Sequence, residues 1–436
     1  MPGQNSERLQ RPTVLHVALL SILIAGIAAG SLYQLHRMTT YGQHTIHPES
    51  APTADSDLFS PWVGTIAALH GQDPYSATVT KQIQVAIYGR ALAPSSGWDP
   101  QAFVYPAYIV FLLGPFTFLS WPQVYFLFAL LGPLIIAVAA LTWLRVCLPD
   151  IRGATRLLAV ALVVISWPAL WSCNSRQPSM FVVAAIALSI LFYSCRFDAT
   201  SGFLLALATV KPHLVLLLCL WLLSLAAAQR MWRFIVAFAL TFFLLIGGSL
   251  VLVPYWISHW IRATIDYSHH SGKTSLLVFV AGRYAGSALA LLLLLAVLFR
   301  LWKLGSVSPD SRRLAYAAAL LLSATACLVP SNVWLVYNNL LLIPGVLLLF
   351  RRPSAKRLPE IFRHVALFSV AIAVVVAPLC AAISAFTGFS VVLALLPSFV
   401  NFLLPIPVTA ALLAADPGSA SRAPSADSAT ASVAIG

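Results

Sequence analysis

The stretch PQVYFLFALLGPLIIAVAALTWL, residues 122–144, decides the fold class, because it carries no charged side chain over a length that crosses a bilayer. About 20 consecutive apolar residues suffice for a transmembrane helix. Hydrophobic residues make up 60% of the chain and the mean hydropathy is +0.88, so the pattern is general. Further apolar runs are Val14–Tyr33, Phe103–Leu119, Leu157–Trp171, Met180–Tyr193, Phe234–Trp256, Leu276–Leu301, Ala315–Val329, Leu335–Phe350, Val365–Phe386 and Val391–Leu413. This repetition excludes a single-anchor protein and predicts an all-α polytopic membrane protein of roughly 10–13 membrane segments.

The basic residues behind the formal net charge of +13 indicate which loops face the cytoplasm. The basic residues form no stripe that would bind nucleic acid, and most lie at the ends of apolar runs; examples are Arg8, Arg11, Arg230, Arg233, Arg312, Arg313, Arg351, Arg352, Lys356, Arg357 and Arg363. By the positive-inside rule these loops and residues 1–13 are cytoplasmic, and membrane lipids are the expected neighbours. Residues 36–100 then form an outer loop.

Residues 14–413 are expected to form one membrane domain, followed by a disordered Ala/Ser-rich tail at 414–436. The outer loop contains short amphipathic stretches near Trp62–Leu69 and at Gln82–Tyr88, which predict helices on the membrane surface. The segment Trp256–Ser275 is interpreted as a second outer loop.

Three points of topology stay open. Because Arg145, Arg152 and Arg156 favour the cytoplasm, one of the two runs between residues 103 and 144 is expected to be re-entrant or half-length. Residues 14–33 could alternatively be a cleavable signal peptide, although the run is long for one. Gly202–Val210 is too short to cross, and Lys211-Pro212-His213 predicts a broken helix pair.

Lys211 and Arg283 are charged residues within apolar stretches, where a charge costs about 2.5–3.5 kcal/mol. All thirteen acidic residues were assigned to loops or tails, so a phosphate is the simplest anionic partner for either side chain. Snorkelling from a helix end is the alternative, and it suits Arg283 better. For Lys211 the polar break with His213 favours a functional role.

Asp55, Asp57 and Asp73 form an acidic cluster at the outer mouth of the spans. A carboxylate there can act as a general base toward a hydroxyl. Helix capping by Asp57 and a turn at Asp73-Pro74 are the structural alternatives, and spacing alone favours them.

Other catalytic patterns are missing from the sequence. The six cysteines include no CxxC pair, and His269-His270 has no further ligands at metal-binding spacing. We therefore expect no metal and no cofactor. The tripeptide Arg176-Gln177-Pro178 is either an ordinary turn or, on the outer side, a polar wall.

The order and spacing of several motifs resemble glycosyltransferase family 87. These motifs are Asp57, GQDPY (71–75), FVYPAYIVFLLGPFTFLSWP (103–122), Gln177, ALATVKPHLVLL (206–217) and VYNNLLLIPGVLLL (336–349). The sequence departs from the family pattern at Leu58, Ala107, Arg176 and Pro178.

The resemblance implies a GT-C-like membrane enzyme. It would move a hexose, often mannose, from a polyprenyl-phosphate donor to a lipid or glycan acceptor at the outer face of a bacterial-type plasma membrane, with inversion. Asp57 would be the base, and Lys211 with His213 would bind the donor phosphate. The further candidates for substrate binding are Asp55, Asp73, Tyr105, Gln177, His269, His270, Arg283, Tyr337 and Asn338. A transporter or flippase of an anionic lipid also fits a broken helix with a buried lysine, and a noncatalytic scaffold would keep the same hydropathy.

Overall fold

A computed structural model describes residues 56–93, 96, 98–271, 274–304, 311–331, 336–350, 357–387 and 398–415, with residues 26, 29, 30 and 33 of the first apolar run. The side chains of residues 270, 271, 357, 358 and 384–387 are not part of this description. Residues 1–13, Asp55 and residues 416–436 lie outside it.

The described chain is almost entirely helical. Its elements are α2 (Phe59–Leu69), α3 (Ala77–Tyr88), η1 (Ala107–Ile109), α4 (Val110–Leu113), η2 (Gly114–Phe116), α5 (Trp121–Cys147), α6 (Gly153–Val164), α7 (Trp167–Asn174), α8 (Ser179–Ser194), α9 (Asp198–Ala208), α10 (Pro212–Ala228), α11 (Trp232–Leu252), α12 (Trp256–Ser271), β1 (Thr274–Ser275), α13 (Leu276–Ala281), α14 (Arg283–Lys303), α15 (Ser311–Leu328), β2 (Pro330–Ser331), η3 (Val336–Leu342), α16 (Ile343–Leu349), α17 (Arg357–Ala371), the π-helical η4 (Ile372–Val376), α18 (Ala377–Thr387) and α20 (Pro405–Ala414). Within the described residues, strand pairing is limited to the antiparallel β1–β2 pair.

Four described helices are long and apolar enough to cross a membrane: Trp121–Cys147, Trp232–Leu252, Arg283–Lys303 and Pro359–Ile383. A fifth candidate is the pair α6 and α7, which is bent by 57°. Shorter apolar helices fill the space between them. The prediction of an all-α polytopic membrane protein is confirmed.

The structure resolves two of the open points of topology, the half-length segment between residues 103 and 144 and the break at residues 211–213. Of the two runs between residues 103 and 144, α5 is full-length, whereas Ala107–Phe116 is a short mixture of 3₁₀ and α turns. The expected half-length segment is therefore the first of the two. The predicted break is also confirmed: α9 ends at Ala208 and α10 begins at Pro212, the first helical position, where a proline loses no backbone hydrogen bond.

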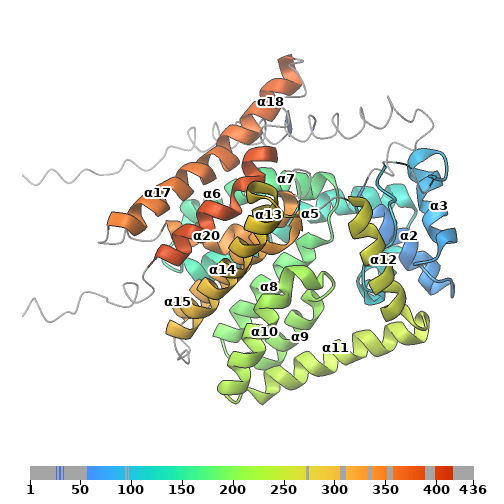
Figure 1. Ribbon diagram of the computed structural model, residues 1–436, viewed down its shortest axis with the longest axis horizontal. Helices are drawn as coiled ribbons and strands as arrows, with labels where there is room; N and C mark the ends of the chain where they lie inside the picture. Colours follow the sequence, from blue (N-terminus) through green and yellow to red (C-terminus); the bar gives the residue numbers. More distant parts are fainter. Residues whose placement is uncertain are drawn as a thin grey trace, which may run out of the picture.

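Figure 1 shows the helices as one elongated bundle. The green helices α8, α9 and α10 lie side by side, α11 runs along the lower edge, and α12 returns toward α2 and α3 at one end. In the interior, α15 is buried without interruption from Leu314 to Cys327, and its run of alanines lets neighbouring helices come close. A Cβ at Gly202 would lie 2.2 Å from the carbonyl oxygen of Phe234, so α9 and α11 are in direct backbone contact.

Two features differ from what the sequence indicated. Residues 256–271, within the segment interpreted as a second outer loop, form a helix, because Trp256, Trp260 and Tyr267 share one face that packs inward while the isoleucines face outward. Acidic residues are also not confined to loops or tails: Asp198 starts α9, Asp266 lies in α12 and Glu360 lies in α17.

Exposed aromatic side chains mark the ends of the long helices. On α11, Trp232 is exposed at the start and Tyr255 lies just beyond the end. On α14, Tyr284 and Trp302 are exposed at opposite ends. Amphipathic rings at both ends of a span are typical of the two membrane–water interfaces.

Candidate active site

Three segments that are distant in sequence meet through hydrogen bonds of one amide side chain. Gln177 lies in the turn between α7 and α8, and its Nε2 donates to Oδ2 of Asp57, 120 positions earlier. Its Oε1 accepts from Nζ of Lys211, 34 positions later, at 2.7 Å. Lys211 Nζ also donates to Oγ of Ser179 at 2.8 Å. The segment at Asp57 and the broken helix pair are thus joined in one polar site.

Asp57 reaches this site because the residue before it ties the chain to the α7–α8 turn. Ser56 Oγ donates to the backbone oxygen of Ser175 at 3.1 Å and accepts from the backbone nitrogen of Leu58 at 3.3 Å. Leu58 occupies the N-cap position of α2, and no side chain caps that helix. The capping interpretation of Asp57 is therefore wrong, and its carboxylate faces Gln177 instead.

Gln177 is fixed by a strained turn. Arg176 has φ of 50°, in the left-handed region that side chains other than glycine rarely adopt. Its guanidinium carbon lies 3.5 Å from the centre of the Tyr125 ring, and Nη1 donates to the backbone oxygen of Asn174. The backbone nitrogen of Gln177 donates to the oxygen of Ser172 at 2.9 Å. These contacts hold a buried amide, 2% exposed, in one orientation.

Lys211 is a buried cation, 7% exposed, that donates hydrogen bonds to two neutral oxygens, Oε1 of Gln177 and Oγ of Ser179. The rings of Tyr105 and Tyr337 each have their centre 5.3 Å from Nζ. Such ring faces attract a cation, and the attraction strengthens when water is excluded. A buried lysine in this setting is well placed to hold a phosphate as a point charge.

A second carboxylate borders the same site. Tyr267 of α12 donates its hydroxyl to Oδ2 of Asp99 at 2.8 Å, and Oδ1 of Asp99 accepts from the backbone nitrogen of Gln101 at 2.9 Å. Burial, followed by the charges of Asp99 and Asp57, raises the pKa of Tyr267 well above its usual value. Burial and the charge of Asp57 do the same to the pKa of Tyr105. Tyr267 therefore remains a hydroxyl donor near Asp57.

The structure brings together five of the residues singled out from sequence: Asp57, Tyr105, Gln177, Lys211 and Tyr337. Asn338 is buried next to Tyr337 in η3. The sequence interpretation missed Ser179, Tyr267 and the site role of Asp99. Amphipathic spacing in residues 256–271 was the available signal for Tyr267, whereas nothing in the sequence pointed to Ser179.

Other predicted residues lie apart from these contacts. Asp73 accepts from the backbone nitrogen of Tyr75 at 3.0 Å, which confirms its turn role, and its Oδ2 lies 2.8 Å from Nδ1 of His259. The exposed side chains of His213, His269 and Arg283 lie at the start of α10, near the end of α12 and at the start of α14. Asp55 and the side chain of His270 are outside the described residues.

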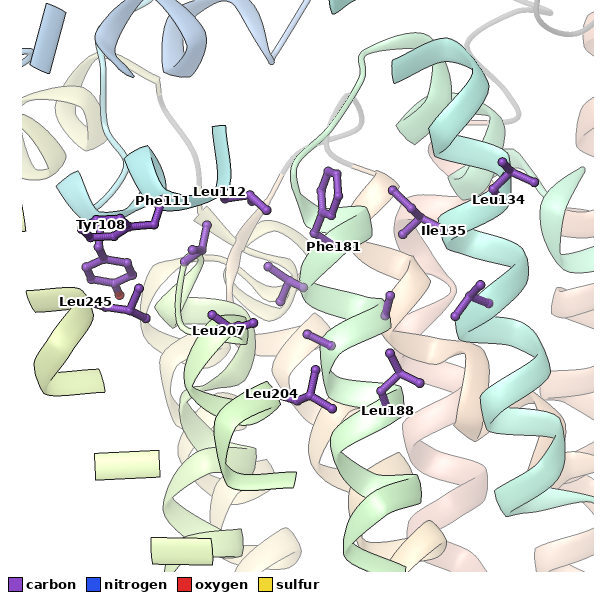
Figure 2. Close-up of a pocket in the computed structure, with 15 residues that line it drawn as sticks. Tyr108, Phe111, Leu112, Leu134, Ile135, Phe181, Leu188, Leu204, Leu207 and Leu245 are labelled. Atoms are coloured by element: carbon purple, nitrogen blue, oxygen red, sulfur yellow. The ribbon is translucent and has the colours of Figure 1, made fainter. Parts of the chain in front are cut away.

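An apolar cavity of about 420 Å³ lies beside the broken pair (Figure 2). It is lined by Tyr108, Phe111, Leu112, Leu134, Ile135, Val138, Phe181, Val182, Ala184, Ala185, Leu188, Leu204, Leu207, Val210 and Leu245. Figure 2 shows these side chains from Tyr108 at one end to Leu134 at the other, with Phe181 between them. The Tyr108 hydroxyl is already used, since it donates to the backbone oxygen of Thr209 at 2.7 Å.

One residue that lines this cavity is the neighbour of Lys211 in the sequence. Phe111, Leu134 and Val138 are also exposed on the outer surface of the bundle, so the cavity lies at its apolar periphery. Val210, which lines it, immediately precedes Lys211. A hydrocarbon chain can therefore be covered by apolar side chains within one residue of the buried cation.

Comparison with known families identifies the class of protein. The profile of Glycosyltransferase family 87 matches residues 103–331, more than half of the chain. This chain belongs to glycosyltransferase family 87. The match includes Tyr105, Gln177 and Lys211, whereas Asp57 and Tyr337 lie outside it.

No curated protein and no solved structure matches the chain. Family 87 membership, together with the apolar helices, makes this protein a multi-pass membrane glycosyltransferase. It also favours an enzyme over the transporter and scaffold alternatives.

Proposed function

We propose that this family 87 protein transfers a hexose, with mannose as the first candidate, from a polyprenyl-phosphate donor to a hydroxyl of a lipid or glycan acceptor. The reaction would take place at the outer face of a bacterial-type plasma membrane. The observation that carries this proposal is the hydrogen-bonded series Asp57–Gln177–Lys211 beside an apolar cavity. A carboxylate, a cation and a lipid-sized apolar surface are the three features that this substrate pair requires.

The step is a single displacement at the anomeric carbon. Asp57 takes the proton of the acceptor hydroxyl as the acceptor oxygen forms its bond to the anomeric carbon. The bond from that carbon to the phosphate oxygen breaks, and its electron pair stays on the departing polyprenyl phosphate. Lys211 stabilises the negative charge that the phosphate keeps. Attack from the face opposite the leaving group inverts the configuration, so a β-linked donor gives an α-linked product.

The surroundings of the two residues suit these roles. The rings of Tyr105 and Tyr337 face Lys211 and provide flat apolar surfaces near the position of a bound sugar. Tyr267 and Asp99 add a hydroxyl and a carboxylate for hydrogen bonds to sugar hydroxyls. Because a phosphate is already a good leaving group, base catalysis and positioning can carry the reaction.

The test is a transfer assay with the purified protein in lipid nanodiscs. Polyprenyl-phosphate mannose and polyprenyl-phosphate glucose, each labelled in the sugar, are incubated with fractionated envelope lipids and glycans as acceptors. We expect label from one donor to move to an acceptor, with one polyprenyl phosphate released per sugar transferred. Binding of donor without release, combined with movement of intact donor between the leaflets of a vesicle, would support the transporter instead.

A further inference from the structure

We infer that Gln177 is a positioning residue that holds Asp57 in its catalytic orientation, rather than a residue that binds substrate. This inference rests on the proposed role of Asp57 as base. Both polar ends of the Gln177 side chain are already used within the protein: Nε2 donates to Asp57 and Oε1 accepts from Lys211. These two hydrogen bonds set the orientation of the amide within the protein, between the carboxylate and the ammonium.

Chemistry fixes the direction of the amide. A lysine ammonium only donates hydrogen bonds and an ionised carboxylate only accepts them. The Oε1 atom must therefore face Lys211 and the Nε2 atom must face Asp57, and a flipped amide would fail at both ends. Ser179 strengthens this arrangement, because its Oγ contacts both Lys211 Nζ at 2.8 Å and Gln177 Oε1 at 3.4 Å.

We expect loss of Gln177 to affect catalysis mainly through Asp57. Lys211 keeps Ser179 as a second partner when Gln177 is lost, whereas Asp57 loses the N–H donor that the turn between α7 and α8 directs at its Oδ2. A hydrogen bond donated to a carboxylate favours the ionised form, which is the form a general base needs. The amide thus both aims the carboxylate and keeps it ready to accept a proton.

Two substitutions separate the effect of the amide nitrogen from the effect of the amide oxygen. Gln177→Met keeps a similar size and removes both hydrogen bonds. Gln177→Glu keeps an oxygen for Lys211, removes the amide donor to Asp57 and places a second carboxyl group beside Asp57. If Gln177 acts through Asp57, both variants lose kcat by roughly tenfold to a hundredfold, and the KM for the donor changes less than about threefold.

The pH dependence of kcat/KM distinguishes a positioning role from a purely structural role, because a structural role would leave this dependence unchanged. In Gln177→Met, the acidic limb of kcat/KM shifts to higher pH, because protons compete more easily for a carboxylate without its donor. Among the described residues, the titratable and charged groups near Asp57 or Gln177 include Lys211, Arg176, Asp99, Tyr105, Tyr267 and Tyr337, and all of them remain in this variant.

Gln84 provides a matched control. It is also a buried glutamine whose amide is used at both ends: Nε2 donates to the oxygen of Pro100 and Oε1 accepts from the nitrogen of Leu92, each at 2.9 Å. These contacts lie within the outer segment and do not include Asp57. We expect Gln84→Met to lower thermal stability at least as much as Gln177→Met while leaving the acidic limb in place.

A double-mutant cycle with Asp57→Asn completes the test. If Gln177 acts only through the base, Gln177→Met has no further effect on the residual kcat of Asp57→Asn. Full kcat in Gln177→Glu, or a further tenfold loss in the double variant, would overturn the inference while leaving the role of Asp57 intact. An Asp57→Asn variant with normal turnover would instead remove Asp57 as the base, and the inference with it, whereas absence of sugar transfer in the unmodified protein would reject the proposed function.

Discussion

Replacing Asp57 by asparagine tests the base assignment without disturbing the local structure. The asparagine Oδ1 can still accept from Nε2 of Gln177, so the hydrogen bonds to Lys211 and Ser179 remain possible. The helix α2 should be unaffected, because its N-cap position is occupied by Leu58 and no side chain caps it. Only the proton acceptor is removed.

The expected magnitudes differ widely between stability and activity. A capping role would make Asp57→Ala cost about 1 kcal/mol, and without a cap we expect both Asp57→Asn and Asp57→Ala to change the free energy of unfolding by less than that. General-base catalysis contributes roughly a hundredfold to ten-thousandfold, so kcat of Asp57→Asn should fall by at least about a hundredfold. The melting temperature should move by only a few degrees.

The assay measures kcat with labelled donor in nanodiscs, together with thermal unfolding of the same samples. Asp73→Asn is the comparison, because Asp73 has a turn contact to Tyr75 and a partner in His259. It should lower turnover far less than Asp57→Asn. Near-normal turnover in Asp57→Asn would refute the reasoning, and loss of activity only in Asp55→Asn would show that the base lies two residues earlier.

Three other predictions address the phosphate, the lipid and the topology. Lys211→Met should raise the donor KM by roughly tenfold or more while the protein still folds, since a phosphate loses its counter-charge; an unchanged donor affinity would remove Lys211 from the phosphate site. Ala185→Phe should narrow the apolar cavity and weaken a long-chain donor more than a short-chain one with the same sugar, and equal effects on both would place the lipid elsewhere. Gln72→Cys and Ser311→Cys, in a background without the native cysteines, should be labelled by an impermeant thiol reagent from opposite sides of the membrane, outside and inside respectively; labelling from one side would reject the assigned topology.

The hydropathy pattern was sufficient to predict the parts of the fold that depend on local composition. The full-length span at residues 122–144 and the break at Lys211-Pro212 follow from the cost of charges in lipid and from the geometry of proline. The short helices α2 and α3 in the outer segment also follow from local amphipathic spacing. Each of these features is decided by neighbours along the chain, so a single sequence contains the information.

Other features were not predicted from the sequence, because they depend on contacts with residues elsewhere in the fold. Helix α12 has an average composition too polar for a hydropathy scan, and its helical form depends on one face of Trp256, Trp260 and Tyr267 packing inward. The break between α6 and α7 lies within the apolar run at residues 157–171, where no charge marks it. The contact of Asp57 with Gln177 spans 120 positions of the sequence, and local spacing favoured a helix cap that the structure does not show.

The residues of the site lie where helices are interrupted, not in the interiors of helices. A continuous helix satisfies its own backbone and presents apolar side chains to lipid, so it offers little chemistry inside a membrane. Asp57 precedes α2, Gln177 lies between α7 and α8, and Lys211 lies between α9 and α10. At each of these points a polar side chain enters the bundle. Because these side chains are hydrogen-bonded to one another, each offsets the cost of placing the others in an apolar interior.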